Sequence, residues 1–309
     1  ASTPQPIASM SVRSPRERTR STAPPSASAR ARTTARTISG RIRSCALTAA
    51  VVGPLRVLVL SLLEGTTQID PASGRIVATR WRDTIAEIAA GQAWGSMDIT
   101  EPDAGSDMAA LRTTATQDEH GAWTLTRQKI FITSGHGKYH FVVARTEPAA
   151  AGLLGLSLFL VTAYRDEPDG RRTRFAAIDR VEEKLGHHGS ATVALSFERA
   201  PAELVGKRGE GFKMMLEFMN QARLSVGFES IGLCEAALRL ARAYAAERRS
   251  MGKPIERHEM IADYLSEMET DIVGLRALAV DAAFHEELGH KKALFGRVLG
   301  DEHDAARQA

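Results

Sequence analysis

The sequence predicts an α+β protein in which a domain of short antiparallel strands is followed by long helices. Short runs of β-branched and aromatic residues, bounded by turn residues, recur through residues 93–206. Apolar residues at helical spacing dominate residues 207–309. Strands gathered in one part of a chain and helices in another are typical of α+β proteins, whereas alternation of the two is typical of α/β proteins.

Residues 1–46 form a basic segment that we expect to be disordered. This segment holds nine of the 40 Lys and Arg residues but a single acidic residue, Glu17. It is rich in Arg, Ser, Thr, Ala and Pro and has no apolar periodicity, so it cannot bury enough surface to offset the entropy of ordering. Three interpretations stay open: a disordered tail, an organelle transit peptide, or the product of a wrong reading frame in a GC-rich gene.

The charge distribution argues against a nucleic-acid partner. The sequence pI of about 9.0 depends on the basic segment, and the remaining residues carry more acidic than basic side chains. Such a chain has no overall positive field that would attract a polyanion. Two cysteines, Cys45 and Cys234, exclude a disulfide scaffold and a cysteine-rich metal site. We therefore expect a reducing compartment: the cytoplasm of a bacterium, or an organelle matrix if the basic segment is a transit peptide.

Residues 47–92 are predicted to be a helical remnant. The apolar stretch Ala46–Leu63 is the one membrane candidate, but Gly53, Pro54 and Arg56 interrupt it. A transmembrane helix needs about 20 apolar residues, so we expect a buried or broken helix and no membrane span. A second helix is predicted from Val77 to Ala90 and ends at Gly91. One face of that helix would carry Trp81, Ile85, Ile88 and Ala89.

The central region, residues 93–206, is predicted to be a β domain. Its strands are short and no helical pattern separates them, which favours an antiparallel sheet or barrel. Turns are expected at His120-Gly121 and Asp169-Gly170. The expected strands are 93–99, 123–126, 129–133, 140–144, 156–161 and 191–197.

The last region, residues 207–309, is predicted to be part of a helical bundle. One helix should run from Glu210 to about Arg249, and Gly252 and Pro254 should end it. A second helix should run from about Glu256 to His285 or beyond, with an apolar seam of alternating four- and three-residue spacing. Two helices leave such a seam half covered, so further helices or a partner subunit are expected. The seam comprises Ile261, Leu265, Met268, Ile272, Leu275, Ala279 and Ala282.

Three motifs could bind a cofactor. The loop Thr100-Glu-Pro-Asp-Ala-Gly-Ser-Asp107 offers hydroxyls and several backbone amides, which can cradle a polar ring edge or a phosphate. Phe131 and Thr133 lie two residues apart on one strand, so both could face one flat ring. The basic cluster in 247–254 could bind phosphate, for which Arg is well suited. Taken singly, the first two motifs are better explained as a polar loop and as a core Phe with a solvated Thr. The third could be a helix end whose basic residues complement its dipole.

Together, these motifs resemble the acyl-CoA dehydrogenase family. The family's flavin loop matches residues 100–107, and its following strand matches Lys129–Thr133. Lys184-Leu185-Gly186, Gly209–Phe212 with Arg223, and Glu247–Gly252 match further segments in the same order, so that the resemblance covers about residues 75–290. It implies binding of FAD, an acyl-CoA substrate, an electron-transfer flavoprotein or similar acceptor, and a homo-oligomer. Residues 47–92 and 207–309 would be incomplete versions of the family's helical domains.

The resemblance also implies site residues. Ile99 and Thr100 would meet the isoalloxazine edge, while Phe131 and Thr133 would pack on the ring and hydrogen-bond it. Gly105 and Ser106 would lie by the cofactor phosphates or the substrate's pantetheine, and Arg223 near the acyl-CoA. Arg248 would reach the FAD pyrophosphate of a neighbouring subunit, beside Met251.

The resemblance does not supply a catalytic base. The family abstracts the substrate's α-proton with a Glu, which most members place late in the helical domain and a minority place just before the residue matching Arg223. Ala222 occupies that second position. Glu217, Glu229 and Glu235 lie on the same predicted helix, where solvated or structural roles are expected for them. The leading hypothesis is therefore FAD-dependent α,β-dehydrogenation of an acyl-CoA. The alternative is a non-catalytic fragment or an interaction module that uses its open helical seam.

Two further patterns are weaker. His285 and His290 are five residues apart, which places them about 140° apart around a helix and prevents both from binding one metal ion. The segment Gly206–Gly211 lacks the spacing and the βαβ context of a dinucleotide-binding fingerprint. We therefore predict no metal site.

Overall fold

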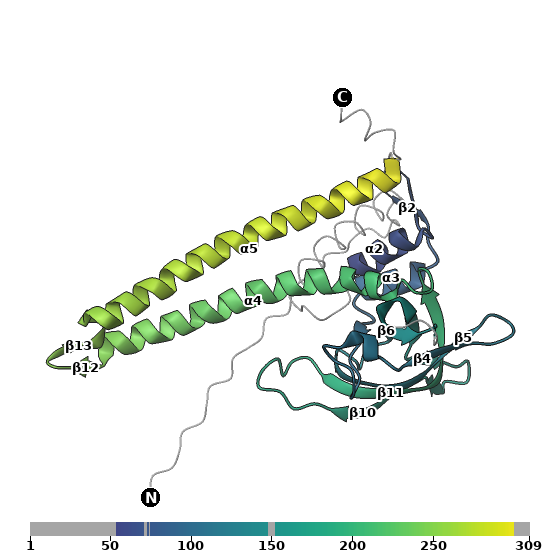
Figure 1. Ribbon diagram of the computed structural model, residues 1–309, viewed down its shortest axis with the longest axis horizontal. Helices are drawn as coiled ribbons and strands as arrows, with labels where there is room; N and C mark the ends of the chain where they lie inside the picture. The colour runs from purple at the N-terminus through teal and green to yellow at the C-terminus, as the bar shows by residue number, and fades with distance from the viewer. Residues whose placement is uncertain (1–53, 71–72, 74, 148–151, 300–309) are drawn as a thin grey trace, which may run out of the picture. The chain divides into compact units, whose positions relative to one another are not determined.

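The computed structural model describes residues 54–70, 73, 75–147 and 152–299 (Figure 1). The predicted basic segment 1–46 and Cys45 lie outside these residues. The N-terminal elements are helix α2 (Pro54–Glu64), strands β1 (Gln68–Asp70) and β2 (Arg75–Ala78), and helix α3 (Arg82–Ala89).

The predicted helix over Val77–Ala90 is correct only in its second half. Its first residues belong to β2, which pairs antiparallel with β1 and places Ile76 opposite Ile69. The β-branched side chains of Ile76 and Val77 suit this hairpin better than a helix. Trp81, directly before α3, and Ile88 within it are both buried.

The central domain contains most of the strands and two short 3-10 turns. Five of its strands and both turns precede residue 163. They are β3 (Gly95–Asp98), η1 (Met108–Ala110), β4 (Thr114–Gln117), β5 (Trp123–Thr133), β6 (Tyr139–Arg145), η2 (Gly152–Gly155) and β7 (Leu156–Thr162). The later strands are β8 (Tyr164–Asp166), β9 (Arg172–Arg174), β10 (Ala176–Val181) and β11 (Thr192–Val205).

The main sheet has seven strands in the order β10-β11-β5-β4-β6-β3, and β7 pairs with both β11 and β6. These pairings close five of the strands into a ring. Its interior is filled by apolar side chains such as Leu125, Val142, Phe159, Leu195 and Phe197. The predicted antiparallel pairing holds except for β6, which pairs parallel with β3 and, at a single position, with β4.

Strand β5 joins two segments that the sequence predicts as separate strands. Its register against β11 shifts at two places, so β5 is one bulged strand rather than two short ones. Between Lys129 and Ile132 the strand carries one residue more than its partner, and Phe131 there has φ 58°. A bulge re-aims side chains, which matters below because Phe131 leaves the sheet's regular alternation.

The helical part begins with α4 (Gly211–Glu247) and ends with α5 (Glu259–Leu299), which lie side by side in Figure 1. Between them are β12 (Arg249–Ser250), β13 (Lys253–Pro254) and the 3-10 turn η3 (Ile255–Arg257). Met251 and Gly252 both have positive φ, as the tight turn of a two-residue hairpin requires. None of the described helices is long and apolar enough to cross a membrane.

The predicted seam of α5 is used in part. Ile272 is buried against Ile231 and Leu238 of α4, and Leu265, Met268 and Ala279 pack beside them. Leu275 is exposed, because α4 covers one face of α5 and leaves the flanking faces open.

The start of α4 is anchored on the sheet. The Phe218 ring packs edge-on against Phe141 of β6 at 5.0 Å between centroids. Gly211 permits this approach, since a Cβ there would lie 2.2 Å from the backbone of Ser157. The first turns of α4 are thereby held against β6 and β7.

Candidate functional site

A cavity of about 440 Å³ lies where the end of β3, the bulged part of β5 and the first half of α4 meet. Its size is within the range of small-molecule sites in proteins. Five of the residues assigned from the sequence are among its lining: Ile99, Thr100, Phe131, Thr133 and Arg223. The position of the missing base, Ala222, lines it too. The remaining lining residues, Met97, Ile132, Met219 and Val226, were not predicted.

Phe131 is the most unusual residue of this cavity. Its side chain is 60% exposed although it belongs to a central strand, and its backbone is in the left-handed region. For a bulky residue this conformation is strained, and such strain is common at binding sites. The bulge thus places an aromatic face at the cavity instead of in the core.

Thr133 and Thr100 supply hydroxyls on two walls of the cavity. The Thr133 Oγ1 atom lies 3.5 Å from that of Thr192, at the limit of a hydrogen bond. Thr100 is tied to β5 through its backbone, because the Ile130 amide donates to the Thr100 carbonyl at 2.9 Å. The backbone that carries the half-buried Thr100 side chain is therefore fixed next to Phe131.

Gly105 and Ser106 lie outside the cavity lining, on the exposed part of the same loop. The loop is closed by a pair of backbone hydrogen bonds between Glu101 and Ala104. A Cβ on Gly105 would lie 3.9 Å from Thr100 Cγ2, an ordinary contact. The described protein atoms therefore give no steric reason for glycine at this position.

Two buried charged residues, Glu101 and Lys129, hold the loop in place. The Glu101 carboxylate accepts hydrogen bonds from the Arg112 and Thr113 amides, the Thr113 hydroxyl and Lys129 Nζ. Burial alone would raise the pKa of Glu101, but the Lys129 charge and these hydrogen bonds hold it below its ordinary value. Burial lowers the pKa of Lys129, while the charges of Glu101 and Asp98 favour its ammonium form. The sequence offered a signal for this pair, since both residues lie within the matched motifs.

Helix α4 forms the apolar wall of the cavity. Met219, Ala222 and Val226 recur at helical spacing on one side of α4. Arg223 contributes the cationic group of the lining, and its Nη1 donates to Asn220 Oδ1 at 2.8 Å. Among the described lining residues there is no Asp, Glu or His, so none of them can act as a general base near neutral pH.

The other acidic residues of α4 are placed elsewhere. Glu229 lies 3.0 Å from His187, and Glu235 forms an ion pair with Arg276 of α5. Glu217 is partly buried and does not line the cavity either.

Arg248 and Met251 are not brought to this cavity. They lie beyond the C-terminal end of α4, roughly 39 Å along the helix from Ala222 at 1.5 Å per residue. Met251 is 92% exposed, and Arg248 is exposed beside it. Within one chain these residues cannot share a ligand's ring with Phe131.

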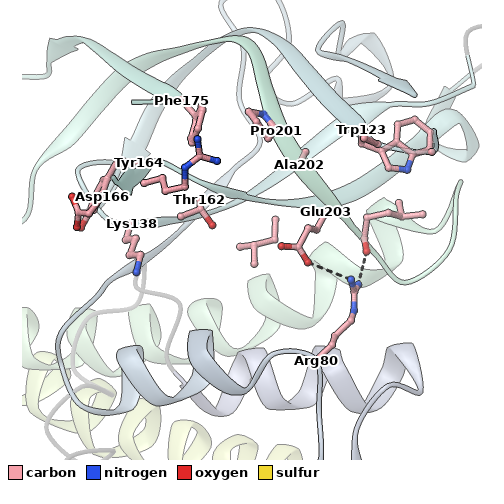
Figure 2. A pocket seen from close by; sticks show the side chains of 15 residues that line it. Arg80, Trp123, Lys138, Thr162, Tyr164, Asp166, Phe175, Pro201, Ala202 and Glu203 are labelled. Atoms are coloured by element: carbon pink, nitrogen blue, oxygen red, sulfur yellow. Dashed lines mark hydrogen bonds and ion pairs between the residues drawn. The ribbon is translucent and has the colours of Figure 1, made fainter. Parts of the chain in front are cut away.

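A second cavity, of about 780 Å³, shares no lining residue with the first and is lined by residues of β5, β7, β8 and β11 among others (Figure 2). Charged side chains at its rim are already paired: Arg80 with Glu203, Lys138 with Glu87, and Asp166 with Arg172. These ion pairs leave little unbalanced charge to recruit an ionic ligand. The lining also includes Trp123, Tyr164, Phe175 and Leu160.

Comparisons with known proteins agree on one family. The profile of the acyl-CoA dehydrogenase middle domain matches residues 96–200, and that of the acyl-CoA dehydrogenase C-terminal domain matches residues 209–299. The acryloyl-CoA reductase (NADH) of Anaerotignum propionicum is 39% identical over 200 residues, 63% of this chain and 48% of the relative. The chain spans about half the length of the curated relatives it matches.

Two solved structures show the same relationship. Butyryl-CoA dehydrogenase of Megasphaera elsdenii aligns with a TM-score of 0.59 at 30% identity, over 67% of this chain and 53% of that one. A chain from a structure titled for the electron transferring flavoprotein of Acidaminococcus fermentans aligns with a TM-score of 0.59 at 32% identity. That alignment also covers 67% of this chain and 53% of the other.

Proposed function

Because the chain belongs to the acyl-CoA dehydrogenase family, we propose that its described part forms the flavin-facing side of an FAD-dependent oxidoreductase. The reaction would be α,β-dehydrogenation of an acyl-CoA thioester. The observation that carries this proposal is the exposed, strained Phe131 in a cavity that also receives Thr100 and Thr133. A flat, largely apolar ring with polar edges fits an aromatic face flanked by two hydroxyls.

The chain's own residues would bind and orient. Phe131 and Ile99 would contact the ring of FAD, and Thr100 and Thr133 would hydrogen-bond its polar edge. When bound, FAD supplies the acceptor for the hydride that leaves the substrate's β-carbon. Met219 and Val226 would exclude water from the α4 side of the cavity.

Substrate contacts are proposed for Ser106 and Arg223. The Arg223 guanidinium lines the cavity and carries a permanent charge, which suits a phosphate or a polarised carbonyl. Ser106 is exposed on the loop next to Thr100, where a long pantetheine chain could pass. Ala222 cannot accept a proton, so the α-proton would have to be removed by a residue that does not line this cavity.

Further partners are proposed on the basis of the family and of geometry. Arg248 is too far along α4 to reach FAD bound in its own chain, so we assign it to the pyrophosphate of FAD in a neighbouring copy of a homo-oligomer. Electrons taken from the substrate need an acceptor, and the similarity to a chain from a structure titled for an electron transferring flavoprotein supports such a partner. A bacterial cytoplasmic location stays a prediction.

FAD titration tests the flavin site. We expect FAD to bind the purified chain weakly, with a shifted visible absorption band on mixing and loss of the cofactor on gel filtration, because the cavity is open and leaves Phe131 60% exposed. The double variant Phe131→Ala/Thr133→Val should weaken this binding further. Tyr164→Ala is the matched control, since it truncates an aromatic residue at the second cavity. Equal binding by both variants would place the flavin elsewhere, and tight stoichiometric FAD after gel filtration would contradict the expected weakness.

A second candidate function is a non-catalytic interaction module. It is favoured by exposed apolar side chains on α4, such as Leu233 and Leu240, which are each 73% exposed. Surfaces of this kind often mark protein contacts. Absence of any FAD-induced spectral change would favour this candidate over the first.

A further inference from the structure

Lys129 is enclosed in the protein and fully hydrogen-bonded. Its side chain is 0% exposed, and its Nζ donates to the Ile99 carbonyl at 2.8 Å, the Val143 carbonyl at 2.9 Å and Glu101 Oε1 at 2.9 Å. An ammonium group has three N–H donors, and here each has its own acceptor. Lys129 therefore joins three segments: its own strand β5, the loop that bears Ile99 and Glu101, and strand β6.

Glu101 joins a fourth segment to these three. Its carboxylate accepts from the Arg112 amide at 2.8 Å, the Thr113 amide at 2.9 Å and the Thr113 hydroxyl at 2.6 Å. The side chain is 2% exposed, so water cannot substitute for these donors. The two charges together join β5, β6, the loop 99–104 and the segment that leads into β4.

Glu101 and Lys129 are adjacent to residues that line the cavity. The carbonyl that Lys129 holds belongs to Ile99, and the next carbonyl, that of Thr100, accepts from the Ile130 amide at 2.9 Å. Phe131 and Thr133 follow on the same strand as Lys129. Lys129 thus links the two walls of the cavity, one bearing Ile99 and Thr100 and the other Phe131 and Thr133.

Stability alone is a poor reason for such a pair. Burying two charges carries a large desolvation cost, and replacing a buried ion pair with apolar residues is often neutral or stabilising. A directional role is better supported, because the six hydrogen bonds tie the segment that bears Ile99 and Thr100 to β5, β6 and residues 112–113. Their geometry sets where the Ile99–Thr100 backbone lies relative to Phe131.

We propose that Glu101 and Lys129 are positioning residues that hold the Ile99–Thr100 wall at the spacing a flavin ring requires. That this spacing serves a flavin ring rests on the proposed function. That the pair fixes the Ile99–Thr100 backbone does not. The pair touches no ligand itself and acts through Ile99, Thr100 and the start of the Phe131 bulge.

The test uses the full chain and the double variant Glu101→Gln/Lys129→Met. Removing both charges avoids an uncompensated buried ion, so the variant should fold, as judged by far-UV circular dichroism and a cooperative urea transition. The matched control is Glu87→Gln/Lys138→Met, which removes a less buried pair, 2.6 Å apart, at the second cavity. The two variants make the same chemical changes at different places in the molecule.

Two measurements distinguish positioning of the cavity wall from general stabilisation of the fold. We expect FAD affinity to fall at least about tenfold in the Glu101/Lys129 variant and to change less than about twofold in the control. Amide hydrogen exchange at Ile130 and Glu101 should accelerate in that variant, while amides of the paired strands β6 and β7 stay protected. A folded variant with unchanged FAD affinity and unchanged exchange at these amides would overturn the proposal.

The exchange measurement stays decisive under two other outcomes. If the parent chain gives no FAD signal, the proposed function fails, but accelerated exchange at Ile130 and Glu101 still supports the fixed backbone and unchanged exchange refutes it. If the double variant does not fold, amide exchange measured on the parent chain alone tests the proposal. Its Ile130 and Glu101 amides should exchange as slowly as those of β6, and exchange at loop rates would overturn the proposal.

Discussion

At the scale of single residues, the cavity depends on one strained position. The bulge in β5 turns Phe131 out of the sheet, and its φ of 58° is one that L-residues rarely adopt. Ile130 and Ile132, its neighbours in the chain, do not have positive φ, so Phe131 is the strained residue of the bulge. Strain that persists at a cavity supports a ligand-facing role for the aromatic ring.

Substitutions at Phe131 should show this strain directly. We expect Phe131→Gly to be more stable than Phe131→Ala by about 1 kcal/mol, because glycine adopts positive φ without steric cost. The order should reverse at Phe228, an exposed phenylalanine within α4, where glycine costs about 1 kcal/mol relative to alanine. Urea unfolding of the four variants measures both differences. Greater stability of alanine at both positions would show that Phe131 is unstrained in solution.

At the scale of elements, Glu64 connects the N-terminal helices to the sheet. Its carboxylate, at the end of α2, accepts from Trp81 Nε1 at 2.7 Å, the Gly206 amide at 3.1 Å and the Thr66 hydroxyl at 2.7 Å, and it pairs with Arg80. The side chain is 6% exposed. Burial would raise the pKa of Glu64, but Arg80 and the other donors hold it below its ordinary value.

Acid should therefore weaken this connection. A carboxylate whose folded-state pKa is lowered adds stability above its ordinary pKa of 4.5, and that stability is lost as the pH falls through the folded-state value. We expect Glu64→Gln to lower the unfolding free energy by about 1–3 kcal/mol at pH 7 and to reduce its decline below pH 5. Glu203→Gln, at an exposed partner of Arg80, should change it by less than about 0.5 kcal/mol. Urea unfolding between pH 7 and pH 4 gives both comparisons, and parallel pH profiles for Glu64→Gln and the parent would contradict the assignment.

At the scale of the whole molecule, the helical part has more apolar surface than α4 and α5 cover for each other. Val226, Leu233, Leu240 and Tyr244 recur on α4 at spacings of seven and four residues, and all are exposed. They form a second stripe, distinct from the Ile231 and Leu238 face that meets α5. This arrangement agrees with the expectation that two helices form only part of a bundle.

The chain taken alone should not dehydrogenate acyl-CoA at a useful rate. The described cavity lining offers no proton acceptor, and the chain spans about half the length of its curated relatives. Anaerobic mixing with FAD, a redox dye and acyl-CoA substrates of several chain lengths measures the rate. Dye reduction that depends on acyl-CoA and is abolished by Thr100→Ala and by Phe131→Ala would refute this expectation, because it would require a base acting at this cavity.

Local patterns in the sequence indicated the fold class and the family. Short β-branched runs specify strands and long amphipathic stretches specify helices, since both depend on neighbouring residues. The motifs at 100–107 and 129–133 indicated three of the residues that line the cavity, Thr100, Phe131 and Thr133. The prediction of helix was wrong for Val77 and Ala78, the last residues of β2, because their strand character comes from pairing with β1.

Only the tertiary structure decided how these pieces act together. The single bulged strand β5, the closure of five strands into a ring and the wall contributed by Met219 and Val226 all arise from contacts between segments distant in sequence. The Glu101–Lys129 pair illustrates the reason. The sequence places the two charges within the motifs of one loop and one strand. Their burial and their joint hold on the cavity wall depend on hydrogen bonds to β6 and to residues 112–113 that no local pattern encodes.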